Sequence, residues 1–173
     1  MNTEIRNEES ELKIIAKKTS RRSLENPGIR HLLRFHHRED RQDGCSKYFV
    51  TFSTYNGRSL LPSQKDCVFN AIRFWDGKKY ELFAVVVLND NVHMIIKPLT
   101  ALPTIIHSIK RFTTYQINNT AVRSGKLWQD KDFDSVIENG KELLKQVEYI
   151  ANNPLKDNSA GIYDNHRWSY IRS

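Results

Sequence analysis

An uninterrupted apolar run followed by an alternating stretch, at residues 82–98, most constrains what this chain can fold into. Leu82 to Leu88 are seven consecutive apolar residues, rich in valine. Such a run is short for a helix and is typical of a strand buried on both faces. Asn89-Asp90 follows as a two-residue polar break, which predicts a tight hairpin. We therefore expect two neighbouring strands in the middle of a sheet.

The second strand of this hairpin alternates between apolar and polar positions. Apolar residues at positions 92, 94 and 96 point to one face, which leaves Asn91 and His93 side by side on the other. On this pattern alone, a strand histidine hydrogen-bonded to a neighbour is the favoured interpretation of His93. The alternative is a polar site on the surface of the sheet.

Composition excludes several classes of protein. The 173 residues fit one domain with a small extension, and 39% hydrophobic and 27% charged residues describe a globular chain. We expect no membrane span, because no apolar run approaches the ~20 residues that a spanning helix needs. The polar N-terminus predicts no signal peptide. Cys45 and Cys67 have no paired spacing, which argues against a structural zinc or a disulfide framework and for a cytoplasmic location.

The net charge of +7 favours a polyanionic partner. Residues 17–38 hold seven Lys and Arg against one acid, Glu25. We interpret this segment either as a solvated arm or as an arm that contacts phosphates. In the second case the contacts would come from Arg21, Arg22, Arg34 and Arg38. We divide the chain into a basic, partly helical extension at 1–45 and a domain at 46–173.

Periodicity and turn residues predict the order β-α-β-β-α-β with a further helix. The expected elements are a strand at 47–54, a helix capped by Ser63, the hairpin, a helix from about 100–103, an extended stretch at 126–136, a helix at 140–152 that stops before Pro154, and an irregular tail. This order predicts the α+β class, a ferredoxin-like antiparallel sheet with helices on one face. Many functions use that fold.

Tyr149 is the second informative residue. It lies off the apolar stripe of the last predicted helix, and its neighbours at three and four positions are polar. A tyrosine used for packing usually has apolar neighbours, so we distinguish a functional tyrosine from a surface tyrosine with a solvated hydroxyl. Asn153, one turn later, points along the same side.

Five motifs in order carry a resemblance to a known family. They are KYFVTFST, FAVVVLNDNVHMIIKP, IKRFTTYQIN, GKLWQDKDFDSVI and VEYIANNPLK, followed by the tail HRWSYIRS. Over residues 46–173 the chain resembles the single-tyrosine HUH transposases of small insertion sequences and is most similar to their branch associated with repetitive extragenic palindromes (REP). The tail resembles the closing Trp-x-x-Ser of that family.

The resemblance implies metal-assisted nicking and rejoining of single-stranded DNA at hairpin sequences, the chemistry of DNA transposition. The nucleophile would be Tyr149, which would form a 5′-phosphotyrosine and leave a free 3′-OH. The two histidines of the family fall on Asn91 and His93, and the third metal ligand falls on Asn153. Mg²⁺ or Mn²⁺ would be the cofactor, because an amide oxygen binds hard cations.

Asn91 departs from the family, and the sequence leaves enzymatic activity undecided, with an active nickase favoured. One alternative is a weakened, domesticated DNA-binding regulator of repetitive palindromic elements. A lower-ranked alternative is an RNA-binding sheet that uses the aromatic residues of the first strand, Tyr48, Phe49 and Phe52. Either a monomer or a homodimer is compatible with the sequence. The predicted nucleic-acid contacts within the domain are Lys110, Arg111, Tyr115 and Lys145.

Overall fold

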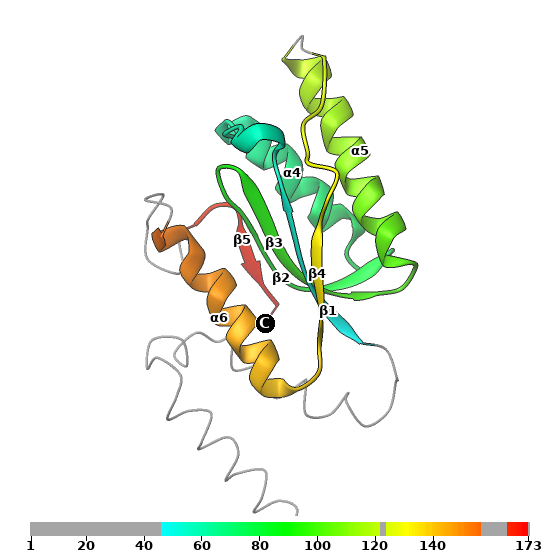
Figure 1. Cartoon of the computed structure of the whole chain (residues 1–173), viewed down its shortest axis with the longest axis vertical. Helices are drawn as coiled ribbons and strands as arrows, with labels where there is room; N and C mark the ends of the chain where they lie inside the picture. The colour runs from blue at the N-terminus through cyan, green and yellow to red at the C-terminus, as the bar shows by residue number, and fades with distance from the viewer. Residues whose placement is uncertain (1–45, 122–123, 157–165, 173) are drawn as a thin grey trace, which may run out of the picture.

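A five-stranded antiparallel sheet forms the centre of the computed structural model, which describes residues 46–121, 124–156 and 166–172 (Figure 1). The strand order is β4-β1-β3-β2-β5. The strands are β1 (Lys47–Ser53), β2 (Tyr80–Val87), β3 (Asn91–Pro98), β4 (Phe133–Ile137) and β5 (Ser169–Ile171). The predicted extension at 1–45, with its four arginines, lies outside the described residues.

Three α-helices cover the two faces of this sheet. They are α4 (Pro62–Trp75), α5 (Leu102–Thr120) and α6 (Gly140–Lys156), and a short 3-10 turn, η1 (Tyr55–Gly57), follows β1. This arrangement confirms the α+β class. Helices α4 and α5 share one face, as predicted, whereas α6, the helix added to the basic pattern, packs on the other. None of the described helices is long and apolar enough to cross a membrane.

Two hydrophobic cores sandwich the hairpin. Val92 and Met94 of β3 are fully buried in the core beneath α4 and α5. Ile95 points to the opposite core, where it meets Val147 and Ile150 of α6. Because β2 contributes to both cores, the strand is apolar at every position from 82 to 87, as a strand covered on both faces should be.

The predicted hairpin is present, with one irregularity. Leu88 N–H donates to the Asn91 carbonyl at 2.8 Å across the two-residue turn. A β-bulge between Leu82 and Ala84 shifts the register of β2 against β3. Phe83 and Ala84 therefore both face the α6 core, while Leu82 faces the other core.

Several elements differ from the sequence predictions. Helix α4 starts at Pro62 rather than after a Ser63 cap, since proline suits the first helical turn and Leu61 N–H bonds the Gln64 side chain. Helix α6 continues past Pro154, because near the end of a helix the missing N–H removes only one bond. The tail predicted to be irregular forms β5, which pairs with β2.

Helix α6 connects the two outer strands of the sheet. It follows β4 at one edge and precedes β5 at the other, so the chain crosses the whole face between them (Figure 1). This crossing carries Tyr149 over the central strands.

Candidate functional site

His93 lies near the middle of the sheet on the face that α6 covers. Its side chain is 7% exposed, and its Nδ1 atom is 2.8 Å from Thr51 Oγ1 on β1. Burial lowers the pKa of His93 from 6.5 to about 4, so the imidazole is neutral at pH 7. A neutral imidazole can accept a proton or coordinate a cation through the nitrogen that Thr51 leaves unused.

Tyr149 places its ring against this histidine. The ring centroids of His93 and Tyr149 are 5.1 Å apart in an edge-on arrangement. Phe49 of β1 completes the group, with centroid distances of 5.8 Å to His93 and 5.9 Å to Tyr149. Tyr149 is nevertheless 39% exposed, so this tyrosine is part of the α6 contact and also reaches solvent.

Asn91 lies two residues before His93 on β3, so its side chain points to the same face. It is opposite Ser53, while His93 is opposite Thr51. Asn91 Nδ2 donates to Asp90 Oδ1 at 2.8 Å, which fixes the orientation of the amide. The buried Oδ1 atom of Asn91 has no hydrogen-bond partner among the described residues. A buried carbonyl oxygen without a partner can accept a hydrogen bond from a ligand or bind a hard cation.

Asn153 is the second buried amide of this face. It follows Tyr149 by one helical turn, is 7% exposed, and its Nδ2 atom also has no partner among the described residues. The O and N positions of an amide are assigned from hydrogen bonds, and here no bond decides them. Asn153 can therefore present an oxygen instead.

Asn91, His93 and Asn153 all lie on the α6 side of the sheet, and their side chains are of kinds that can bind a hard divalent cation weakly. Two amides, each with one buried atom that has no hydrogen-bond partner among the described residues, and a neutral imidazole offer three uncharged ligands. Within the described ranges, no group of three or more His, Cys, Asp or Glu side chains could hold a metal ion. Neutral ligands alone compensate little of the lost hydration of Mg²⁺, so an anionic ligand such as a phosphate would be needed to complete the shell.

The predicted nucleic-acid contacts divide between the two faces of the sheet. Lys145 is exposed on α6, on the face of Tyr149. Arg111 and Tyr115 are exposed on α5, across the sheet from the site. Lys110, also on α5, is engaged in an ion pair with Asp132 and donates to the Gln129 carbonyl at 2.7 Å.

An open groove of about 1590 Å³ runs along α5 on that opposite face. Tyr48 and Val50 line it from β1, and Trp128 lines it from the segment before β4. The groove is separated from Tyr149 by the full thickness of the sheet. It is therefore not an extension of the candidate site.

Sequence reasoning did not identify Thr51 and Phe49 as members of the site. Alternation along β1 puts both residues on the face that holds His93. The missing information was the neighbour of that strand, since only the pairing of β1 with β3 brings Thr51 to His93. That pairing joins residues 42 positions apart, beyond the reach of local patterns.

Comparisons with known proteins identify solved structures that are similar to this one. No family model matches the chain, and no curated protein matches it. The structure is similar to that of a REP-associated tyrosine transposase bound to a REP hairpin, with a TM-score of 0.61 and 22% identity over 72% of this chain and 75% of the other. A candidate transposase from Deinococcus radiodurans R1 gives a TM-score of 0.47 and 20% identity, over 65% of this chain and 94% of that one. The first likeness establishes a shared fold.

Proposed function

We propose that this protein is a transposase-like enzyme that binds hairpin-forming single-stranded DNA and nicks it through Tyr149. The observation that supports this proposal best is the contact between the Tyr149 and His93 rings, 5.1 Å apart. The last helix and the central strand thus bring together the two residues on which the proposed chemistry depends. The fold shared with a transposase bound to a hairpin agrees with the same function.

The proposed reaction is a phosphoryl transfer. Tyr149 Oη loses its proton to solvent and attacks the scissile phosphorus, the bond from phosphorus to the 3′ oxygen breaks, and that oxygen takes up a proton. The products are a 5′-phosphotyrosine and a free 3′-OH. Since the phosphotyrosine bond preserves the energy of the phosphodiester, a later 3′-OH can reverse the step without a nucleotide cofactor.

His93, Asn91 and Asn153 are the residues that would hold a divalent cation. When bound, Mg²⁺ or Mn²⁺ would polarise the scissile phosphate and offset its developing negative charge. The Thr51 hydroxyl fixes the orientation of His93, and the Asp90 carboxylate fixes that of Asn91. Both oriented side chains would thereby be prepared to receive a ligand.

Incubation with single-stranded DNA carrying a palindromic hairpin, in Mg²⁺ or Mn²⁺, tests the proposal. We expect an adduct between protein and DNA that resists denaturant and disappears in Tyr149→Phe, because phenylalanine has no nucleophilic oxygen. The matched control is Tyr55→Phe, which removes the hydroxyl of another exposed tyrosine, 44% exposed against 39% for Tyr149. An adduct lost in Tyr55→Phe and kept in Tyr149→Phe would contradict the assignment of the nucleophile.

A second candidate function is supported by the donor set. With three uncharged ligands and no carboxylate, the site can retain DNA binding while holding metal too weakly for nicking. The protein would then be a regulator that binds repetitive palindromic elements. Hairpin binding without any adduct, unchanged by Tyr149→Phe, would favour this function over the nickase.

A further inference from the structure

Phe133 of β4 lies level with His93 of β3, on the far side of the intervening strand β1. It is opposite Thr51 in the pairing of β1 with β4, and Thr51 is opposite His93 in the pairing of β1 with β3. Directly opposed residues of an antiparallel pair point to the same face. Ile137, on the same strand and of the same parity, is buried in the α6 core. Phe133 therefore faces the side of the sheet that holds Tyr149.

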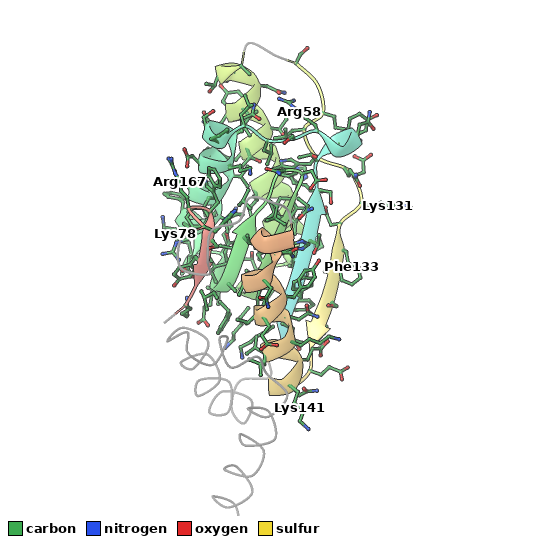
Figure 2. The ribbon with its side chains drawn as sticks, turned by 90° about the vertical axis from the view of Figure 1, so that its left-hand side faces the viewer. Arg58, Lys78, Lys131, Phe133, Lys141 and Arg167 are labelled. Atoms are coloured by element: carbon green, nitrogen blue, oxygen red, sulfur yellow. The ribbon has the colours of Figure 1, made fainter. Side chains whose placement is uncertain are left out.

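Helix α6 leaves this aromatic ring uncovered. Phe133 is 59% exposed, whereas Ile137 at the other end of β4 is 4% exposed. The difference follows from the path of the chain, which turns from Ile137 into α6 and leaves the start of β4 at the open edge. Figure 2, which looks onto α6, shows Phe133 on this outer strand, clear of the helix.

The two aspartates that flank Phe133 in the sequence lie on the α5 side of the sheet. Asp134 is opposite Val50 and lines the groove on the α5 face, and Asp132 is paired with Lys110 of α5. Lys131, two positions before Phe133, is exposed. Neither aspartate therefore places its charge beside the Phe133 ring on the α6 side of the sheet.

We propose that Phe133 is a stacking platform for an unpaired nucleobase adjacent to the phosphate at Tyr149. This inference rests on the proposed function. Strands lie about 4.8 Å apart, so two strand steps place the backbone of Phe133 roughly 10 Å from that of His93. That separation suits a base on the strand whose phosphate lies at His93. Aromatic rings stack on any base, so the contact would position the strand and add little sequence preference.

The test compares two phenylalanines of equal exposure on opposite faces. Phe74 of α4 is also 59% exposed. Each is changed to alanine in the full chain carrying Tyr149→Phe, and the affinity for a labelled DNA hairpin with single-stranded flanks is measured in Mg²⁺. We expect Phe133→Ala to weaken binding about tenfold or more, as the loss of one stacked base predicts. Phe133→Trp should keep the affinity, and Phe74→Ala should leave it unchanged.

Abasic probes distinguish stacking from a general loss of affinity. Removing single bases from the flanks should weaken binding at one or two adjacent positions, and this sensitivity should vanish in Phe133→Ala. An identical abasic profile in both proteins would overturn the inference. So would a Phe133→Ala variant that binds DNA normally but changes its sedimentation, since the ring would then contact a second copy of the chain.

The two proposals can fail separately. If the unsubstituted protein forms the covalent adduct and Phe133→Ala binds DNA as tightly as Phe133 does, only the stacking inference is wrong. If the hairpin neither binds nor forms an adduct with any of the proteins, the proposed function is wrong and the inference falls with it.

Discussion

At the scale of single residues, His93 is the side chain whose surroundings most affect the chemistry. It is almost completely buried, and the Thr51 hydroxyl is its hydrogen-bond partner at 2.8 Å. An apolar environment destabilises the imidazolium, so the folded protein keeps this group neutral. The same burial links the charge of His93 to the stability of the whole fold.

The unfolding free energy should therefore decrease as the pH falls below 6.5. Burial lowers the pKa of His93 to about 4, so between these values the unfolded chain binds a proton that the folded chain does not. The contribution of His93 to the unfolding free energy is complete above pH 6.5. Below that pH it decreases by about 1.4 kcal/mol per pH unit, and the total loss near pH 4 is roughly 3 kcal/mol. Urea unfolding in EDTA, compared with His93→Gln, measures this difference. Parallel pH curves for the two proteins would contradict it.

At the scale of elements, Asp66 of α4 binds the segment that leads into the C-terminal strand. Asp66 accepts a hydrogen bond from Trp168 Nε1 at 2.8 Å and pairs with Arg167 at 2.8 Å. Val87 N–H of β2 donates to the Trp168 carbonyl at 2.9 Å. The exchange rate of the Val87 amide therefore reports whether the chain before β5 remains in place.

Asp66→Ala should loosen this end of the sheet. It leaves the partly buried Trp168 N–H unpaired, at a cost of about 1–2 kcal/mol, and the Val87 amide should exchange correspondingly faster. Asp66→Asn is the matched control, because it retains an acceptor for Trp168 and loses only a largely exposed ion pair worth about 0–1 kcal/mol. Equal exchange rates in the two variants would show that the tryptophan bond does not hold the strand.

Elements with local signals were predictable, and those fixed by distant contacts were not. The hairpin at Asn89-Asp90 and the alternation after it follow from neighbouring residues, and both are confirmed. The bulge at Phe83 was not predictable, because a strand that is apolar on both sides gives no alternation in which an extra residue would show. Strand β5 was not predictable either, since three residues form a strand only when β2 is available to pair with them.

The candidate site also combines features that local patterns predict with features that depend on contacts between distant segments. The strand pattern placed His93 on the same face as Asn91, and the helical pattern placed Tyr149 off the apolar stripe of its helix. Which face α6 covers depends on the packing of Val147 and Ile150 against the strands, a contact between distant segments. The meeting of Tyr149 with His93 was implied by the family resemblance and by no local pattern.

At the scale of the whole molecule, the net charge of +7 should govern the salt dependence of binding. Affinity for single-stranded DNA falls with salt by a slope of about 0.7 for each phosphate neutralised. Changing four arginines of the predicted extension to glutamine in the full chain should reduce that slope by as much as about 3. The four are Arg21, Arg22, Arg34 and Arg38.

The matched control replaces the same four arginines by lysine, which retains the charge and should retain the slope. Binding is measured by fluorescence anisotropy at several salt concentrations. An unchanged slope in the glutamine variant would mean that the segment at 17–38 does not contact phosphate.

The path of α6 from one sheet edge to the other has a mechanical consequence. Tension on the C-terminus would act first on β5, whose three residues make it the shortest of the described strands. If β5 peeled from β2, α6 would keep its anchor at β4 and lose the strand at its far end. Val147 and Ile150, which flank Tyr149, pack in the core against the central strands, so we expect the contact of Tyr149 with His93 to outlast the loss of β5.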